Sequence, residues 1–264
     1  MDLKLKILKI YEKNKFSAND KEIFLEFRSL LNKGEIRAAN KEDGRWVTNN
    51  WVKKGIIAGF KMGNIVRYGN FYDKDTFPLQ DIAGKKNVRF VPGGSAIREG
   101  SFIGNDVILM PPMYINVGAF VDSGSMIDSH ALVGTCAQVG KNVHLSAASQ
   151  LGGVLEPISS NPVIIEDNVF IGGNCGIYEG IIVEENAIIA AGVTITAGTP
   201  IFDAVNNKFL CKVNNITIIP KKAVVVPGSR KFKNNPDFSV YCPIIIKYRD
   251  KMTDRSVLLE ELLR

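Results

Sequence analysis

The chain has 264 residues and a formal charge of +6, with basic residues spread along it and acidic residues mixed among them. Nucleic-acid binding would call for basic residues interleaved with aromatic residues on one face, so we expect no nucleic-acid partner. No apolar run is long enough to span a bilayer, and the first residues do not resemble a signal peptide. We therefore expect a cytoplasmic protein with no membrane partner, whose mild positive charge suits a small polyanionic ligand.

The first part of the chain, residues 1–88, is predicted to form a mostly helical domain. Apolar residues recur there at helical spacing, and turn-forming residues interrupt them. The expected elements are two helices up to Gly34, strand-like pieces at 34–39 and 43–47, a third helix capped by Asn49 or Asn50, and an irregular link at 61–90.

The central part of the chain carries an aliphatic residue at every sixth position, with a two-residue slip after Leu151. This period matches neither a helix nor a simple strand, so it indicates a repeat architecture, and an irregular β-sandwich is the weaker alternative. We expect a triangular prism in which three hexads complete one coil, with the aliphatic residue inside and a small residue four positions later. The series is Ile97, Ile103, Leu109, Ile115, Val121, Ile127, Val133, Val139, Leu145, Leu151, then Ile165, Ile171, Ile177, Val183, Ile189, Ile195 and Ile201.

Glycine recurs directly after the aliphatic residue, at Gly104, Gly134, Gly140, Gly152 and Gly172. We expect these glycines at sharp corners that need unusual backbone angles. Cys136 and Cys175 fall within the repeat and are expected to be buried free thiols. With no CxxC pair and only two histidines in the sequence, a zinc site with three imidazole ligands, as in hexapeptide carbonic anhydrases, is disfavoured, and we expect no metal.

Two insertions and a tail complete the chain, whose predicted parts are 1–88, 89–228 and 229–264. The slip falls in a polar, proline-bracketed loop near 154–162, and loops of this kind project from a solenoid and often carry function. The remaining expected elements are a hairpin near 203–215, a partial coil with Ile219 and Val225, a strand at 240–247 and a short helix at 255–264.

Several segments resemble one family of hexapeptide-repeat acyltransferases, the tetrahydrodipicolinate N-succinyltransferases of the diaminopimelate route to lysine. They are Asp43-Gly44-Arg45-Trp46-Val47-Thr48, Met126-Ile127-Asp128, 134–146, 152–157 and 163–168. The resemblance extends over nearly the whole chain. It implies a mainly β fold, a left-handed parallel β-helix of hexapeptide repeats with an N-terminal helical domain and a small C-terminal strand and helix extension.

The same resemblance implies transfer of a succinyl group from succinyl-CoA to the amine of a ring-opened dicarboxylate. It also implies a homotrimer with active sites between neighbouring coils, and no permanently bound cofactor. The residues that match substrate-binding positions of the family are Arg89 and Asp128. Arginine can grip a carboxylate through two parallel hydrogen bonds, and Asp128 can orient or deprotonate the attacking amine. The weaker alternative for Arg89 is a surface charge at the entrance of the coil. Without the resemblance, Asp128 is equally well explained as a corner residue that caps backbone amides.

The sequence departs from the family at Gly176, where many members carry a carboxylate. His130, close to Asp128, and Glu179, three residues beyond Gly176, are the candidates to replace that carboxylate in catalysis. Lys221, Lys222 and Arg230 are candidates for binding the phosphates of CoA, together with Lys231, although a solvated basic turn explains them as well. Acetyl transfer from acetyl-CoA and a non-catalytic scaffold remain alternatives.

Overall fold

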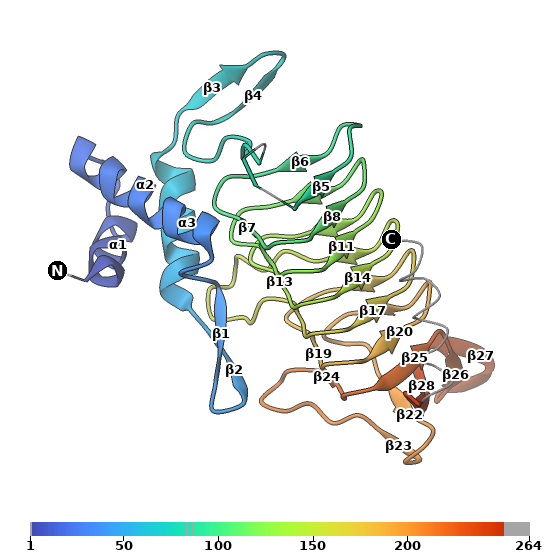
Figure 1. Cartoon of the computed structure of the whole chain (residues 1–264). Coiled ribbons are helices and arrows are strands. Elements are labelled where there is room, and N and C mark those ends of the chain that lie inside the picture. The colour runs from blue at the N-terminus through green and yellow to red at the C-terminus, as the bar shows by residue number, and fades with distance from the viewer. Residues whose placement is uncertain (1, 83, 86, 251–264) are drawn as a thin grey trace.

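The computed structural model describes residues 2–82, 84–85 and 87–250. Figure 1 shows a helical N-terminal part, a stack of short strands wound into a prism, and a group of strands at the far end of the prism. The predicted helix at 255–264 lies outside the described residues. Within the described part of the chain, no helix has both the length and the apolar character needed to cross a bilayer.

The helices predicted for the N-terminal part of the chain are confirmed. They are α1 (Leu3–Tyr11), α2 (Ala18–Lys33) and α3 (Asn50–Met62). Ser17 and Asp20 form a capping box at the start of α2, and Gly34 ends that helix in the left-handed conformation, at φ 72°. Asn49 occupies the N-cap position of α3, but its side chain makes no capping bond and donates instead to the carbonyl of Arg37 at 2.8 Å.

Two antiparallel hairpins flank α3, and the sequence predicted only one of them. β1 (Ala39–Glu42) pairs with β2 (Arg45–Thr48), so the first strand begins at the residue where the prediction ended it. β3 (Ile65–Tyr68) pairs with β4 (Phe71–Lys74) inside the segment expected to be an irregular link. Neither β3 nor β4 has a buried face, so the apolar alternation that signals a strand is missing there.

The strands of the prism form three sheets, in which each strand of the repeat pairs in parallel with the strand one coil earlier and one coil later. The first face contains β5 (Arg89–Phe90), β8 (Ile108–Leu109), β11 (Met126–Ile127), β14 (His144–Leu145), β17 (Phe170–Ile171), β20 (Ile188–Ile189) and β25 (Ala223–Val226). The second face contains β6 (Ala96–Ile97), β9 (Tyr114–Ile115), β12 (Leu132–Val133), β15 (Gln150–Leu151), β18 (Gly176–Ile177) and β21 (Thr194–Ile195). The third face contains β7 (Phe102–Ile103), β10 (Phe120–Val121), β13 (Gln138–Val139), β16 (Ile164–Ile165), β19 (Ile182–Val183) and β24 (Ile218–Ile219).

The chain visits the first, second and third faces in turn. We call the edge between the first and second faces the first corner, that between the second and third faces the second corner, and that between the third and first faces the third corner. Every aliphatic residue of the series from Ile97 to Ile195 is at most 3 % exposed, which confirms the predicted inward column. Each such side chain stabilises the fold by roughly 1.5–3 kcal/mol. The thiols of Cys136 and Cys175 are buried and free, as predicted.

The last member of the predicted series does not continue the coil. Ile201 is buried, but its carbonyl accepts from the amide of Leu210 at 2.9 Å in an excursion away from the prism. Ile219, in β24, takes the next place on the third face and pairs with Val183. The predicted hairpin near 203–215 is confirmed in smaller form, as β22 (Phe202–Asp203) and β23 (Lys208–Phe209).

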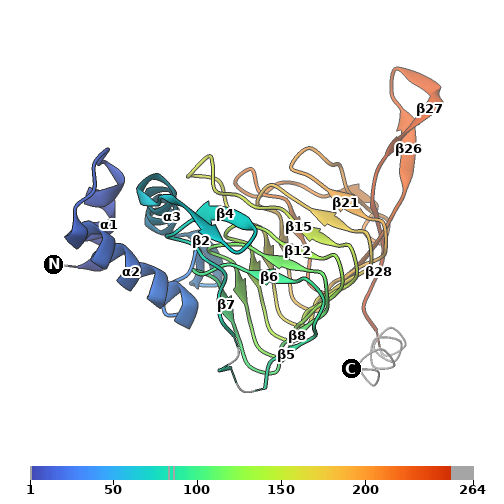
Figure 2. The ribbon, with the colours of Figure 1, turned by 90° about the horizontal axis from the view of Figure 1, so that it is seen from above.

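The C-terminal strands close the far end of the prism. β26 (Ser229–Phe232) and β27 (Asn235–Tyr241) form a hairpin that projects from it, as Figure 2 shows. β28 (Ile244–Tyr248) then pairs with β25 and β22. The single strand predicted at 240–247 is therefore two strands, separated at Cys242 and Pro243.

The helical domain lies against the third face (Figure 2). The guanidinium carbon of Arg37 lies 3.6 Å from the ring centre of Phe120, and its Nε donates to Gln138 Oε1 at 2.9 Å. Trp46 packs next to Ile164 in a cluster that joins the first hairpin to the coil. The N-terminal domain therefore covers outer side chains of this face.

The glycines that follow the aliphatic residues do not have unusual backbone angles, so the physical reason predicted for them is wrong. The left-handed residues lie two positions later, at Gly118, Gly124, His130 and Cys136 among others. The glycines are instead required by close approach of the next coil. A Cβ on Gly104 would lie 2.7 Å from the amide nitrogen of Ser123, and one on Gly134 would lie 2.3 Å from that of Gly153.

We expect Gly104→Ala to lower the free energy of unfolding by on the order of 1–3 kcal/mol, because the added methyl group would force two coils apart. Gly198→Ala is the matched control, since the nearest atom to its Cβ is Thr196 Oγ1 at 3.9 Å. Denaturant unfolding of both variants measures the difference. Equal stability of the two would contradict the close-approach explanation.

Candidate active site

A groove of about 840 Å³ lies at the second corner, where both insertions leave the coil. The loop between β15 and β16 forms one wall, and the excursion after β21 forms another. Polar and charged side chains line much of it, including Glu156, Ser159, Asn161, Tyr178, Glu179, Thr196 and Asn214. The projecting loop predicted near 154–162 thus borders this groove.

Glu179 lies in this groove. It follows β18 with a left-handed backbone, at φ 52°, and its side chain is exposed. Its Oε2 accepts a hydrogen bond of 2.6 Å from the amide of Ala197, one coil further on. The carboxylate is therefore fixed against the coil and presented to the groove.

The space at Gly176 is filled by an aromatic ring. A Cβ at this position would lie 2.5 Å from Cε2 of Tyr178, whose hydroxyl donates to Gln150 Oε1 at 3.0 Å. A carboxylate-bearing residue at position 176 would displace that ring. Sequence analysis did not select Tyr178. The one signal for it was its position two residues after Gly176, which places both side chains on the same side of the strand.

Asp128 and His130 lie at the first corner, on the other side of the second face from Glu179. Asp128 follows β11 and is half-buried, and its Oδ1 accepts from the amide of Ser129 at 2.7 Å. His130 is exposed and has a left-handed backbone, at φ 61°. Glu179 lies one face away and two coils further along the axis, about 10 Å in that direction alone. Within one chain the structure therefore does not bring Glu179 to Asp128 and His130.

Arg89 begins the first face. It is exposed, and it lies two strands from Met126 along the parallel ladder, about 10 Å. Asp128 lies two residues after Met126, at the end of β11. The structure thus places Arg89 and Asp128 on the same side of the prism, close to the start of the coil.

Small residues occupy the first corner below Asp128. They are Ser146, Ala147, Ala148, Gly172, Gly173, Ala190, Ala191 and Gly192. The stripe ends near the hairpin formed by β26 and β27, where Arg230 lies over the ring of Phe209 at 5.7 Å. Along the first face, Met126 and Val224 are four strand spacings apart, about 19 Å.

Lys221 and Lys222 do not lie at the first corner with Arg230. Both follow β24 at the third corner, where Lys221 Nζ pairs with Glu185 Oε1 at 2.9 Å. The hydrogen bond to Glu185 and the charge of that carboxylate raise the pKa of Lys221. The structure therefore separates the predicted phosphate-binding residues into two groups, and Lys221 already has an acidic partner.

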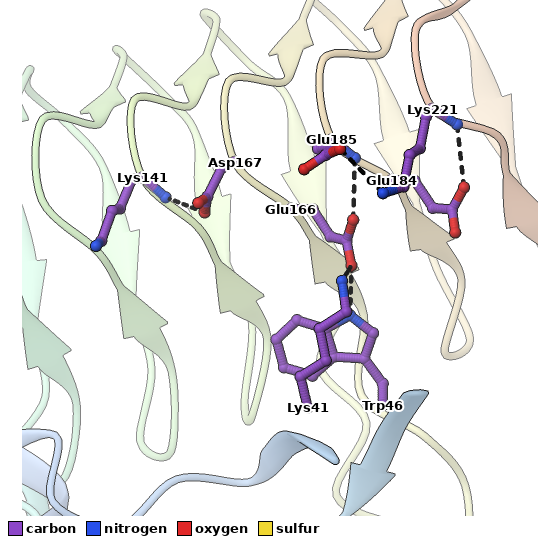
Figure 3. A network of polar contacts seen from close by, with 8 residues as sticks. All are labelled: Lys41, Trp46, Lys141, Glu166, Asp167, Glu184, Glu185 and Lys221. Atoms are coloured by element: carbon purple, nitrogen blue, oxygen red, sulfur yellow. Dashed lines mark hydrogen bonds and ion pairs between the residues drawn. The ribbon is translucent and has the colours of Figure 1, made fainter. Parts of the chain in front are cut away.

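Glu166 is the centre of a polar network at the third corner (Figure 3). It accepts from Lys41 Nζ at 2.6 Å, from Trp46 Nε1 at 2.8 Å and from the amide of Glu185 at 3.0 Å. Burial alone would raise the pKa of Glu166, but these hydrogen bonds outweigh burial and hold the pKa below its ordinary value. Trp46 of the Asp43–Thr48 motif thus fastens the first hairpin to the coil.

No group of three or more histidine, cysteine, aspartate or glutamate side chains within residues 2–82, 84–85 and 87–250 is arranged to hold a metal ion.

Comparison with known proteins extends to both parts of the chain. A family profile described as the N-terminal region of tetrahydrodipicolinate N-succinyltransferase matches residues 2–62, and one described as the hexapeptide repeat of succinyl-transferase matches residues 162–197. A 2,3,4,5-tetrahydropyridine-2,6-dicarboxylate N-succinyltransferase from Paraburkholderia xenovorans is 47 % identical over 246 residues, which cover 89 % of this chain and 86 % of that one. The chain belongs to this family of N-succinyltransferases.

Other members are similarly close. The Buchnera aphidicola enzyme of the same name is 43 % identical over 243 residues, covering 89 % of this chain and 85 % of its own. A crystal structure from Campylobacter jejuni, described as a putative 2,3,4,5-tetrahydropyridine-2-carboxylate N-succinyltransferase, superposes with a TM-score of 0.50 at 17 % identity. The alignment covers 88 % of this chain and 64 % of that one, and it supports the fold alone.

We expect Glu166→Gln to lower the free energy of unfolding by on the order of 1–2 kcal/mol at pH 7, because the ion pair with Lys41 is lost. The pKa of Glu166 is lowered in the folded state, so its stabilisation is present above the unfolded pKa and is lost as the pH falls through the folded pKa. The difference in unfolding free energy between wild type and Glu166→Gln should persist at neutral pH. It should become smaller only below the ordinary pKa of a glutamate, 4.5.

Thermal unfolding at a series of pH values measures this difference. Glu184→Gln is the matched control, because Glu184 holds the same position one coil later. Among the described residues, its side chain accepts a hydrogen bond only from the amide of Lys221, at 3.0 Å. Equal losses of stability in the two variants, or a loss in Glu166→Gln that does not change with pH, would contradict the assigned role of Glu166.

Proposed function

We propose that the chain transfers a succinyl group from succinyl-CoA to the amine of tetrahydrodipicolinate in its ring-opened form, a step of the diaminopimelate route to lysine. The observation that carries this proposal is the identity of 47 % to a named succinyltransferase over 89 % of the chain, which includes the helical domain as well as the coil. Acyl-CoA is a substrate in this reaction, and no resident cofactor takes part.

The reaction needs a nucleophile, a place for the oxyanion and a base. The acceptor nitrogen attacks the thioester carbonyl carbon, so that a C–N bond forms and the carbonyl oxygen becomes negative. Collapse of this intermediate breaks the C–S bond and releases CoA, while a base takes the proton from nitrogen. Backbone amides at the glycine-rich corners can hydrogen-bond the oxyanion.

Asp128 is the base in our proposal. Its Oδ1 is held by the amide of Ser129, which fixes the carboxylate, and within the described chain its Oδ2 has no hydrogen-bond partner. Oδ2 can therefore accept the proton of the amine or orient it. Arg89, on the same side of the prism, binds a carboxylate of the acceptor, and His130 and Glu179 are the further candidates for proton transfer.

Succinyl-CoA lies along the stripe of small residues at the first corner. Small side chains leave the backbone accessible to a long, thin ligand, and the stripe leads from Asp128 toward Arg230. The guanidinium of Arg230 then meets the phosphates of CoA. Lys221 and Lys222 are weaker candidates than Arg230 for binding the phosphates, because they lie at the third corner.

The active protein is a homotrimer of left-handed coils in this proposal. Support comes from the first face, whose outward side chains include Ile108, Met126, Phe170 and Ile188, all half-buried in one chain. A closed three-fold assembly would cover such a face. It would also allow the first corner of one subunit, with Asp128, to meet the second corner of its neighbour, with Glu179. We divide each subunit into a helical domain (residues 1–88), a coil (residues 89–228) and a C-terminal extension (residues 229–264).

Thiol release by the purified protein tests the function directly, with succinyl-CoA and acetyl-CoA compared on the same acceptor. We expect turnover with succinyl-CoA to exceed that with acetyl-CoA. Preference for acetyl-CoA would make the chain an acetyltransferase, and release of no thiol with either donor would favour a scaffold.

We expect Asp128→Asn to lower kcat by at least about a hundredfold, because a positioned base contributes about 10²–10⁴ in rate. Asp122→Asn is a matched control, since Asp122 holds the same position one hexad earlier and its Oδ1 accepts from the amide of Ser123 at 2.7 Å. Steady-state kinetics of both variants, with light scattering to check assembly, measure the effect. If both variants keep near-normal kcat, Asp128 is only a corner-capping residue.

We expect Arg89→Ala to reduce kcat/KM for the acceptor by a factor that corresponds to about 1.5–3 kcal/mol, the range for hydrogen bonds to charged groups. The KM for succinyl-CoA should barely change. The same kinetic assay, with each substrate varied in turn, separates the two constants. A change confined to the donor would reassign Arg89 to the phosphates of CoA.

A further inference from the structure

Lys53 lies in α3 and is fully buried, at 0 % exposure. Its Nζ donates a hydrogen bond of 2.5 Å to the carbonyl oxygen of Ser160. Ser160 belongs to the loop between β15 and β16 and lines the groove at the second corner. The bond therefore connects the helical domain to a wall of the groove.

A buried ammonium is costly, and this one has little to offset the cost. Burial lowers the pKa of Lys53, and the thiol of Cys136 opposes that change only in part. The Ser160 carbonyl is the single hydrogen-bond acceptor that the described residues provide for the Lys53 ammonium. The neighbouring buried residues of α3, such as Val52 and Ile56, are apolar. An apolar side chain at position 53 would suit helix packing better, so packing alone does not explain a lysine there.

The same loop has a second polar tie to the helical domain. Thr48, the last residue of β2, donates through its hydroxyl to Asn161 Oδ1. On the opposite side, the carbonyl oxygen of Asn161 lies against Gly180, where a Cβ would approach it to 2.6 Å. The segment 159–161 is thus held between the N-terminal domain and the coil, directly beside Glu179.

We infer that Lys53 is a positioning residue for the acceptor site, and that the N-terminal domain shapes the groove through the Lys53–Ser160 bond. This inference rests on the proposed function. The groove is polar and contains Glu179, so we assign it to the amine-bearing acceptor, while CoA occupies the first corner of the neighbouring subunit. Lys53 acts through the backbone of Ser160 and touches no reacting atom.

The position of the bond determines which kinetic constant should change. Loosening segment 159–161 weakens binding of the acceptor equally in the ground state and the transition state, which raises KM and leaves kcat nearly unchanged. Replacing a buried charge by an apolar side chain of similar length is often neutral or stabilising for the fold. A purely structural lysine would show the opposite behaviour, with lower stability and an unchanged KM.

Lys53→Met tests the inference, with Lys54→Met as the matched control. Lys54 is the next residue of α3, and its ammonium lies over the ring of Tyr11 at 5.0 Å, away from the loop. For Lys53→Met we expect the acceptor KM to rise by about tenfold or more, with kcat and the succinyl-CoA KM within about twofold of the wild type. The melting temperature should be unchanged or higher. Lys54→Met should leave all four quantities unchanged.

Hydrogen exchange of the loop gives a readout that does not depend on turnover. Amides of residues 158–161 should exchange faster in Lys53→Met than in Lys54→Met. If the two variants have the same exchange in this loop and the same acceptor KM, the inference is overturned. If the wild type shows no transfer from succinyl-CoA, the proposed function fails, and faster exchange would then support only the link between the domain and the loop.

Thr48→Val keeps the test decisive if Lys53→Met fails to fold. It removes the hydrogen bond to Asn161 without a large change in volume. We expect a smaller rise in the acceptor KM, about threefold, in the same direction and with the same local increase in exchange. No change in either measurement would overturn the inference.

Discussion

The burial of one aliphatic side chain in every hexad is the constraint on which the rest of this structure depends. Each of these side chains stacks on its equivalents one coil above and below, so neighbouring coils are held in fixed register. Fixed register aligns the outward positions as well, and they form columns on three faces and three corners. A residue's place in its hexad therefore decides which column it joins, and the chemistry of the protein follows from those columns.

The three faces then serve different purposes. The third face is covered by the chain's own helical domain, through contacts such as that of Arg37 with Phe120. The first face remains apolar and open in one chain, and in our proposal a second subunit covers it. The first and second corners carry the polar groups of the proposed site. Asp128 and Glu179 lie at different corners of one prism, so a site that uses both needs two subunits.

Much of this arrangement could be predicted from the sequence, because the period alone fixes the inward column. The shared corner of the two insertions could not be predicted, because a two-residue slip makes Leu151 and Ile195 seven hexads apart. The structure instead places eight extra residues after Leu151, so that Leu151 and Ile195 lie on the same face, two complete coils apart. The docking of the helical domain could not be predicted either, because it depends on side-chain contacts between distant segments, such as Lys53 with Ser160. The role of the glycines was missed for a similar reason, since the atoms that exclude a Cβ on Gly104 belong to the next coil.

Activity of mixed assemblies tests most directly the claim that the site spans two subunits. Asp128→Asn and Glu179→Gln variants would be prepared separately, each with reduced activity, and then unfolded and refolded together in equal amounts. We predict that the refolded mixture regains about one quarter of wild-type activity, because random mixing in a closed ring places intact Asp128 beside intact Glu179 at that fraction of all interfaces. Activity no higher than the average of the two parents, or full activity of Glu179→Gln alone, would contradict it.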